Sequence, residues 1–218
     1  MNVEARTTPP RQRGIALVLK TCLDRTVAAG ALIVSAPVML AIGVAIRVSM
    51  GRPMLFAQER PGRGGRLFRV FKFRTMRDAR GVDGRPLPDG ERLTPLGRFL
   101  RASSLDELPQ LWNVVKGDLS LVGPRPLLPQ YLALYSTEQA RRHDVLPGIT
   151  GWSQVNGRNG ISWDEKLALD VWYVDHWSLA LDAKVLLKTA SVVLRQSSIS
   201  NGEHATMPEF RGAGDPEP

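Results

Sequence analysis

The chain has 218 residues, enough for one domain of ordinary size, and its 29 Lys and Arg against 21 Asp and Glu give a net charge of +8, which favours an anionic partner such as nucleic acid, anionic lipid or a phosphorylated substrate. Its single cysteine, Cys22, excludes an intrachain disulfide, and its three histidines lack the spacing of zinc ligands. The sequence contains no Walker A loop and no G-x-S-x-G nucleophile elbow.

A membrane segment is the first predicted element, after a basic N-terminal segment over residues 1–25. Residues 27–46 carry no charge, and a helix of that length covers about 30 Å, the hydrocarbon thickness of a bilayer. Pro37 removes a hydrogen bond near the middle, and basic residues flank both ends, whereas a spanning helix carries its positive charge on one side. We therefore predict a re-entrant membrane helix over residues 26–47, broken at Pro37, with a kinked span as the alternative.

Residues 53–76 have the pattern of a β-hairpin. Two extended segments, at 54–57 and 67–73, are separated by the turn-forming run Pro61-Gly-Arg-Gly-Gly. Alternation along the second strand places Lys72 and Arg74 on one face. A solvated strand face is the more common role of such a pair.

The rest of the chain is predicted to be mostly helical, which makes the whole an α+β, membrane-associated single domain. The predicted elements are a loop over 78–94, a short helix over 96–102, a helix from Asp106 to about Lys116, a constrained loop over 117–126, a helix over 127–145 with an exposed end at Arg141 and Arg142, a turn-rich segment over 147–162, two helices over 163–196 and a disordered tail over 198–218. Arg158 lies between two Asn-Gly turn signals, which display its side chain from a tight loop or leave it a surface turn residue.

The last two predicted helices have patterns that suit a membrane surface. The first carries a set of large amphipathic side chains, Trp163, Trp172, Tyr173 and Trp177. The second carries a basic stripe made of Lys184, Lys188 and Arg195. We predict interfacial helices, with packing into the core as the alternative reading of the same pattern.

Two adjacent carboxylates and a constrained arginine form the clearest candidate for a catalytic site. Asp106 and Glu107 lie at a predicted helix start, and Arg125 follows between two prolines. A carboxylate can attack phosphorus or hold a divalent metal, and a rigid guanidinium can neutralise phosphate oxygens. The alternative is structural, because Ser104 and Glu107 fit a capping box and Asp106 fits a helix N-cap.

Several motifs occur together in one order. They are the proline-containing apolar segment, Phe56-Ala-Gln58-Glu-Arg60, Lys72-Phe-Arg-Thr-Met76, Ser104-Leu-Asp-Glu-Leu-Pro-Gln110, Lys116-Gly-Asp-Leu-Ser-Leu-Val-Gly-Pro-Arg-Pro126, Pro147-Gly-Ile-Thr-Gly-Trp152 and Gln154-Val-Asn-Gly-Arg158. Over roughly residues 13 to 197 the chain resembles the small form of the bacterial sugar transferase family, the monotopic polyprenyl-phosphate phosphoglycosyl transferases. Well-known members have a Ser-Pro pair at the break in the membrane segment, whereas here Ala36 separates Ser35 from Pro37.

The resemblance implies a reaction and a location. A sugar-1-phosphate moves from a UDP-sugar to polyprenyl (undecaprenyl) phosphate, UMP is released, and a covalent aspartyl-phosphosugar intermediate forms on the way. This would be the first membrane step of polysaccharide or glycoconjugate synthesis. The partners are then the two substrates and membrane lipid, and the catalytic domain, residues 48–197, lies on the cytoplasmic face of the bacterial inner membrane.

The resemblance also implies roles for individual residues. The family's nucleophile maps onto Asp106, with Glu107 as its partner and Mg²⁺ as the cofactor that both carboxylates hold. The family's phosphate-binding arginine maps onto Arg125. Further basic residues in matching motifs, expected to bind substrate phosphate, are Lys72, Arg74 and Arg158.

Two other classes of protein fit parts of the sequence. A membrane-tethered module that binds nucleic acid would explain the charge, but the basic residues are dispersed and no recognised binding motif occurs, so no nucleic acid partner is predicted. A non-catalytic scaffold would retain the fold, but Asp106, Glu107 and Arg125 are all present. Which UDP-sugar is used, which glycan it enters and the oligomeric state are not predicted.

Overall fold

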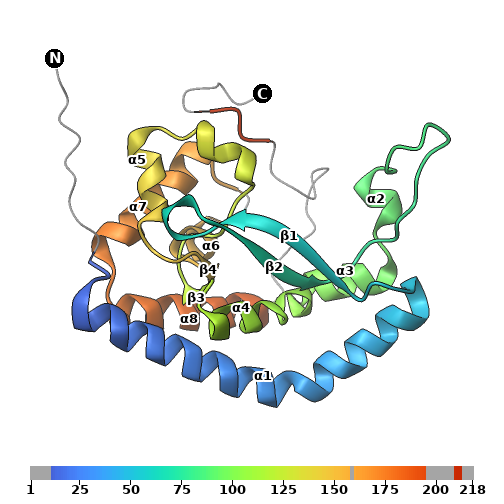
Figure 1. Cartoon of the computed structure of the whole chain (residues 1–218), viewed down its shortest axis with the longest axis horizontal. Helices are drawn as coiled ribbons and strands as arrows, with labels where there is room; N and C mark the ends of the chain where they lie inside the picture. Colours follow the sequence, from blue (N-terminus) through green and yellow to red (C-terminus); the bar gives the residue numbers. More distant parts are fainter. Residues whose placement is uncertain (1–10, 158–159, 195–208, 213–218) are drawn as a thin grey trace.

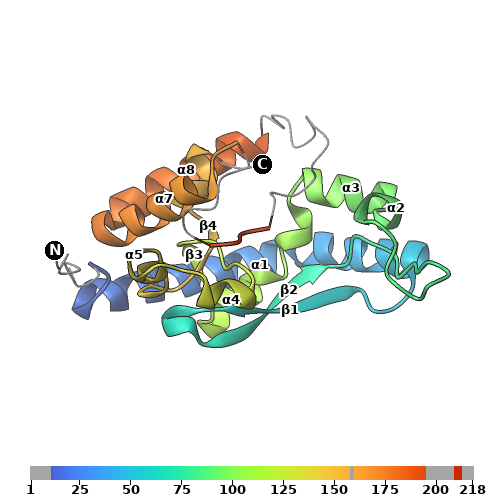
Figure 2. The same cartoon turned by 90° about the horizontal axis from the view of Figure 1, so that it is seen from above.

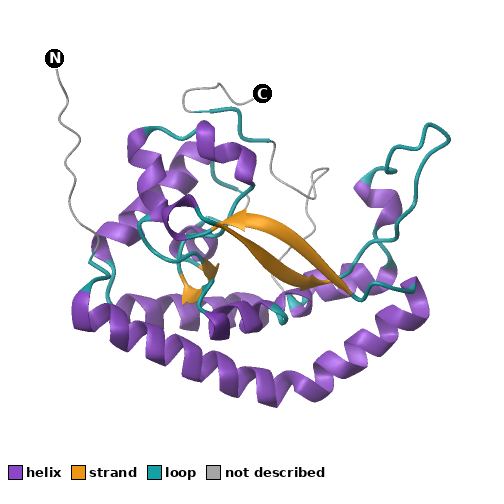
Figure 3. Ribbon diagram, in the orientation of Figure 1, coloured by secondary structure: helices purple, strands orange, loops and turns teal. Residues whose placement is uncertain are grey.

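The computed structural model describes residues 11–157, 160–194 and 209–212. Its α-helices are α1 (Gly14–Met50), α2 (Asp89–Arg92), α3 (Pro95–Ala102), α4 (Gln110–Lys116), α5 (Thr137–Ala140), α6 (Trp152–Asn156), α7 (Trp163–His176) and α8 (Leu179–Leu194). The strands are β1 (Leu55–Pro61), β2 (Leu67–Phe73), β3 (Ser120–Val122) and β4 (Gly148–Thr150), and short 3₁₀ turns are η1 (Arg63–Gly65), η2 (Leu105–Glu107), η3 (Pro129–Ala133) and η4 (Arg141–His143). The predicted α+β class with a predominance of helix is confirmed (Figure 3).

Helix α1 extends beyond the predicted membrane segment at both ends. It runs without interruption from Gly14 to Met50, with Pro37 inside it. The helix changes direction near its middle (Figure 1), and a proline is a common cause of such a bend because it lacks the N–H of the helical ladder. The predicted break at Pro37 is therefore a bend, because the helix continues through this residue without interruption.

The remainder of the chain lies on one side of α1 (Figure 1) and packs against it near both ends. Near its start, the Lys20 ammonium lies 2.6 Å from the Asp182 carboxylate of α8, and both side chains are buried. Near its end, Ile42 and Ile46 pack in one cluster with Phe73 of β2. The first half of α1 thus belongs to the domain, and the predicted separate N-terminal segment over 1–25 does not describe its residues from Gly14 onward.

The opposite side of α1 is apolar and uncovered. Only 11% of its most apolar 18-residue stretch is buried, and among the described residues it is the one helix long and apolar enough to cross a membrane. Ile33, Val34 and Val48 are exposed on it. Because exposure of apolar surface to water is unfavourable, this side of the helix suits contact with lipid.

The predicted β-hairpin is present and is fastened to α4. Strands β1 and β2 are antiparallel, with Leu55 opposite Phe73 and Phe56 opposite Lys72. The amide side chain of Asn113 in α4 accepts a hydrogen bond from the Phe71 N–H at 3.2 Å and donates one to the Arg69 carbonyl at 2.7 Å. Two backbone groups at the free edge of β2 thereby gain hydrogen bonds, and the helix that follows the carboxylates is held beside the strand that carries Lys72.

A short parallel pair, β3 and β4, was not predicted, because both strands lie in segments with strong turn signals. Ser120 is opposite Gly148 and Val122 is opposite Thr150. The pair requires close backbone contact, since a Cβ on Gly148 would lie 2.1 Å from the Gly123 backbone nitrogen. This contact fixes the start of the loop that carries Arg125.

The two C-terminal helices α7 and α8 are present, but two of their predicted interfacial side chains, Tyr173 and Trp177, are buried, whereas Trp172 is exposed. Tyr173 and Trp177 belong to a core cluster with Val122, and the Tyr173 hydroxyl donates to Asp182 at 2.7 Å. Lys184 and Lys188 lie 5.5 and 5.1 Å from the ring centre of Trp152 in α6. Both ammonium groups thus lie close to a ring of the domain, although the Lys184 side chain is exposed, and Arg195 lies outside the described residues.

Two other predictions are wrong in part. The segment over 127–145 is not one helix but η3, α5 and η4, and Arg142, predicted to be exposed, is buried with only 2% of its surface accessible. The predicted disordered tail includes residues 209–212, which are described. Phe210 is 3% exposed and packs against Tyr131 and Trp163, with ring centres 5.5 and 5.3 Å away.

Candidate active site

Asp106 and Glu107 lie in a 3₁₀ turn between α3 and α4, not at a helix start. Ser104, just before the turn, has a φ of 58° and makes no side-chain capping bond. Helix α4 begins later, with Pro109 at its N-cap position. Both structural alternatives, the capping box and the Asp106 N-cap, are therefore wrong, and the two carboxylates have other partners.

Glu107 is held by two cations that come from distant parts of the chain. Its Oε1 lies 2.6 Å from the Lys72 Nζ and 2.6 Å from an Arg125 guanidinium nitrogen. A second Arg125 nitrogen lies 3.4 Å from Oε2, so the guanidinium contacts both carboxylate oxygens of Glu107. The three side chains are partly exposed, which leaves the cations accessible to an anion arriving from solvent.

Asp106 differs from Glu107 in its partners and in the direction of its pKa shift. It is 8% exposed, and within the described part of the chain no hydrogen bond or ion pair engages its carboxylate. Burial and the adjacent Glu107 charge raise the pKa of Asp106 to about 6, against the opposing effect of Lys72, Arg101 and Arg125. Near neutral pH the carboxylate is ionised and unpaired, as a nucleophile requires.

The pKa of Glu107 moves in the other direction. Burial alone would raise it, but the charges of Arg125 and Lys72 and their hydrogen bonds hold the pKa of Glu107 at about 2. The same contacts raise the pKa of Arg125, while burial and the nearby Arg125 charge lower the pKa of Lys72. Glu107 therefore stays ionised and holds two cationic side chains, Lys72 and Arg125, beside Asp106.

The backbone at Arg125 is fixed by a buried ion pair that the sequence did not indicate. The Arg142 guanidinium donates to the Arg125 carbonyl at 2.7 Å and lies 2.7 Å from the Asp170 carboxylate of α7. The second oxygen of Asp170 accepts from the Ser153 hydroxyl at 2.7 Å. Breaking such a pair leaves a buried charge without a partner, which typically costs about 3–5 kcal/mol.

Two further arginines lie near members of the site, Arg101 near Asp106 and Arg60 near Arg125, and neither was predicted as a site residue. Arg101, at the end of α3, lowers the pKa of Asp106 through its charge and donates to the Thr75 hydroxyl at 3.1 Å. Arg60, at the end of β1, has its pKa lowered by burial and by Arg125. Arg60 lies within the family motif around Phe56, whereas Arg101 carries no pattern beyond its place in a basic helix.

Of the remaining predicted phosphate-binding residues, Lys72 is at the site and Arg74 has other partners. The Arg74 guanidinium donates to the carbonyls of Met76, Met50 and Arg52, at 2.9, 3.4 and 3.0 Å. It thereby ties the end of α1 to the end of β2. Arg158 lies outside the described residues.

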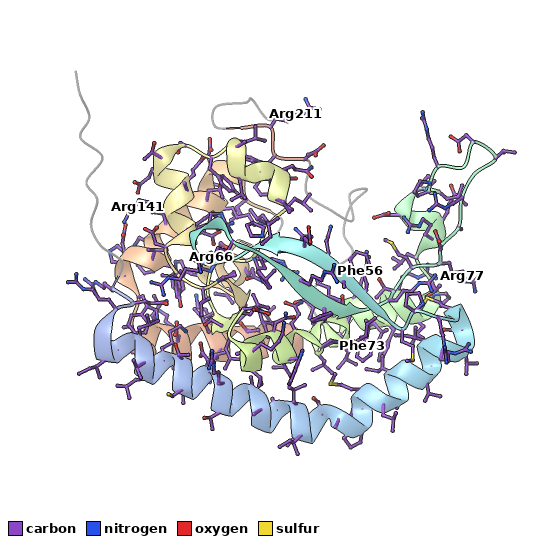
Figure 4. The ribbon with its side chains drawn as sticks, viewed as in Figure 1. Phe56, Arg66, Phe73, Arg77, Arg141 and Arg211 are labelled. Carbon is purple, nitrogen blue, oxygen red and sulfur yellow. The ribbon has the colours of Figure 1, made fainter. Side chains whose placement is uncertain are left out.

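An apolar cavity lies on the α1 side of the hairpin. Phe73 points from the hairpin toward α1, whereas Phe56 lies on the other face (Figure 4). The cavity is about 740 Å³ and is lined by Met39, Leu40, Gly43, Val44, Arg47, Met54, Leu55, Phe71, Phe73, Pro109 and Trp112. Its lining is almost wholly hydrocarbon, with one cation, and it adjoins the exposed side of α1.

Comparison with known proteins places the chain in a family. The family model for bacterial sugar transferases matches residues 15–196, and the chain belongs to this family. It is 52% identical over 199 residues to the uncharacterized sugar transferase EpsL of Bacillus subtilis (strain 168), covering 91% of this chain and 98% of that protein.

Two longer relatives carry named activities. The chain is 42% identical over 193 residues to the UDP-glucose:undecaprenyl-phosphate glucose-1-phosphate transferase of Xanthomonas campestris pv. campestris, covering 84% of this chain and 40% of that protein. It is 38% identical over 195 residues to the undecaprenyl-phosphate galactose phosphotransferase of Salmonella typhimurium (strain LT2), covering 82% of this chain and 41% of that protein. The chain thus spans less than half the length of these two relatives.

Proposed function

We propose that the chain transfers a sugar-1-phosphate from a UDP-sugar to undecaprenyl phosphate and releases UMP, as an early membrane step in the synthesis of a polysaccharide or glycoconjugate. The observation that carries this proposal is the contrast between the two neighbouring carboxylates. Asp106 is unpaired within the described residues, while Glu107 is held by Lys72 and Arg125. Relatives named as UDP-glucose and undecaprenyl-phosphate transferases support the substrate classes.

The proposed chemistry consists of two displacements at one phosphorus atom. An Asp106 carboxylate oxygen attacks the phosphorus that bears the sugar, the bond to the bridging oxygen breaks, and UMP leaves with that oxygen. The sugar phosphate is then bonded to Asp106 as an acyl phosphate. A phosphate oxygen of undecaprenyl phosphate next attacks the same phosphorus, which forms the lipid diphosphate sugar and restores the Asp106 carboxylate.

The cations around Asp106 have the positions that this chemistry needs. A carboxylate and a diphosphate repel each other, and Arg125 with Lys72 supplies positive charge against both. Glu107 holds these two side chains in place before substrate arrives, so less reorganisation is needed when the anion binds. We assign Glu107 to this positioning role.

The donor set at the site fits Mg²⁺ in one respect. In the described residues no group of three or more His, Cys, Asp or Glu forms a metal cage, but Mg²⁺ is commonly held by one or two carboxylates together with substrate phosphates. Asp106 could supply one such carboxylate. Glu107 could contribute its Oε2, whose contact with Arg125 is long, at 3.4 Å. Bound there, the ion would neutralise charge on the diphosphate.

The packing of α1 supports a re-entrant topology, and we propose that the catalytic domain lies on the cytoplasmic face. Lys20 and Met50, near the two ends of the helix, contact the same domain through Asp182 and Arg74. Both ends therefore lie on one side of any membrane that the exposed face of α1 enters.

The apolar cavity between α1 and the hairpin offers a surface for the isoprenoid chain of the acceptor.

The experiment that tests this function measures UMP release by the purified full-length chain. A panel of UDP-sugars is incubated with Mg²⁺ and undecaprenyl phosphate, and the lipid product is identified by mass spectrometry. We expect one or a few sugars to give UMP and an equal amount of lipid diphosphate sugar. Absence of UMP with every sugar, or release of UDP instead, would contradict the proposal.

A further inference from the structure

We propose that a second cavity, separate from the carboxylate site, binds an anionic phospholipid by its headgroup. The cavity is about 690 Å³ and lies where α1 and α8 begin side by side (Figures 1 and 2). It is lined by Arg11, Arg13, Ala16, Leu19, Trp177, Ser178 and Leu179. Among the described residues, no hydrogen bond or ion pair joins this lining to Asp106, Glu107, Lys72 or Arg125.

The polar part of the cavity is cationic. Arg11 and Arg13 are both exposed, and neither guanidinium has a carboxylate partner among the described residues. The neighbouring acidic side chains are already used, because Asp182 accepts from the Trp177 indole at 3.1 Å and from Lys20 at 2.6 Å. Two unpaired arginines beside a serine hydroxyl match the charge and hydrogen-bonding capacity of a phosphodiester.

The remainder of the cavity is hydrocarbon and continues onto the lipid-facing side of α1. Leu19 is 56% exposed and Leu179 is 41% exposed. The same part of α1 also exposes Ile15 and Val18. A free phosphate ion would use the arginines alone, whereas a phospholipid would use both the arginines and this apolar rim. We therefore assign the cavity to a lipid headgroup with the first part of its acyl chains.

Quenching of tryptophan fluorescence tests this site, because Trp177 forms part of its wall. Detergent-purified full-length protein is titrated with brominated phosphatidylglycerol or with brominated phosphatidylcholine in mixed micelles. We expect the anionic lipid to quench tryptophan fluorescence at a lower mole fraction than the zwitterionic lipid. Trp177→Phe should remove the saturable part of this quenching. The double variant Arg11→Gln/Arg13→Gln should weaken binding of the anionic lipid by about fivefold for each arginine removed.

A matched control separates this site from the effect of net charge. Arg80→Gln/Arg85→Gln removes the same charge from the loop between β2 and α2 and should leave the lipid preference unchanged. Equal loss in both double variants would overturn the proposal, as would equal quenching by the two lipids. Full displacement of the lipid by millimolar inorganic phosphate would show that the cavity binds a free anion instead. UMP release in detergent is expected to persist in both variants.

Discussion

The Arg125 guanidinium contacts both carboxylate oxygens of Glu107, a residue 18 positions earlier in the chain, and leaves the adjacent Asp106 without a partner among the described residues. Two neighbouring carboxylates thus receive opposite environments, and their pKa values move to about 2 and about 6. The proposed roles follow from this difference, with Glu107 as the fixed counterion and Asp106 as the carboxylate that reacts.

Replacing Arg125 with lysine should be strongly damaging although the charge is kept. A single ammonium cannot contact both oxygens of Glu107 and also present a planar fork to a phosphate. We expect a loss of about 100-fold in kcat/KM for the UDP-sugar, comparable to removal of a stabilising donor at a reacting centre. The measurement is steady-state UMP release with an unfolding curve for each variant. Near-normal kinetics would show that Arg125 contributes only to folding.

The rate should fall on the acid side of about pH 6. Asp106 is the proposed nucleophile and its pKa is raised to about 6, so its reactive carboxylate form decreases as pH falls through that value. Glu107→Gln removes the negative neighbour and should move this acid limb to lower pH while reducing the maximum rate. The pH profile of kcat/KM for UMP release measures both effects. A rate that stays constant down to pH 5 would contradict the assignment.

Phe210 should stabilise the folded chain although it lies near the C-terminus. Its ring is buried against Tyr131, Tyr135 and Trp163, so Phe210→Ala should lower the free energy of unfolding by about 3 kcal/mol. The control is Arg211→Ala, at an exposed neighbouring position. Thermal unfolding in detergent compares the two. Equal melting temperatures would show that this segment does not dock in solution.

The topology of α1 can be tested with cysteine labelling. After Cys22→Ser, single cysteines at the exposed positions 11 and 59 should both react with a membrane-impermeant maleimide only when the cytoplasmic face is open. Pro37→Ala relieves about 3 kcal/mol of helix penalty and should yield mixed topology with reduced activity. Labelling of the two positions from opposite faces would establish a spanning helix. Unchanged topology in Pro37→Ala would show that other features set the turn.

The sequence predicts local structure well where the pattern is strong. Uniform apolar composition indicates α1, and alternation with a glycine-rich turn indicates the hairpin. The β3–β4 pair was missed because three-residue strands are too short to show a period. Tyr173 and Trp177 were placed at a surface because aromatic residues have the same helical spacing in a core and at an interface.

The candidate site was predicted in its residues and not in its geometry. Asp106, Glu107, Arg125 and Lys72 all carry recognisable motifs, yet their contacts span separations of 35 and 18 residues that no local pattern encodes. The capping-box interpretation of Glu107 was excluded by the conformation of Ser104, which makes no capping bond, and by the observed partners of Glu107. Arg142 could not be identified in advance, because a basic residue buried by a distant aspartate looks like a surface residue in the sequence.

The formation of a covalent adduct on Asp106 tests the central proposal most directly. Full-length protein is mixed with Mg²⁺ and its UDP-sugar in the absence of undecaprenyl phosphate, and intact-mass spectrometry and UMP release are recorded together. We predict about one UMP per protein molecule, a mass increase equal to one sugar phosphate that maps to Asp106 and disappears on adding the lipid acceptor, and neither signal in Asp106→Asn. If UMP appears only when the lipid acceptor is present and the protein never gains mass, or if Asp106→Asn still turns over, the two-step mechanism is wrong.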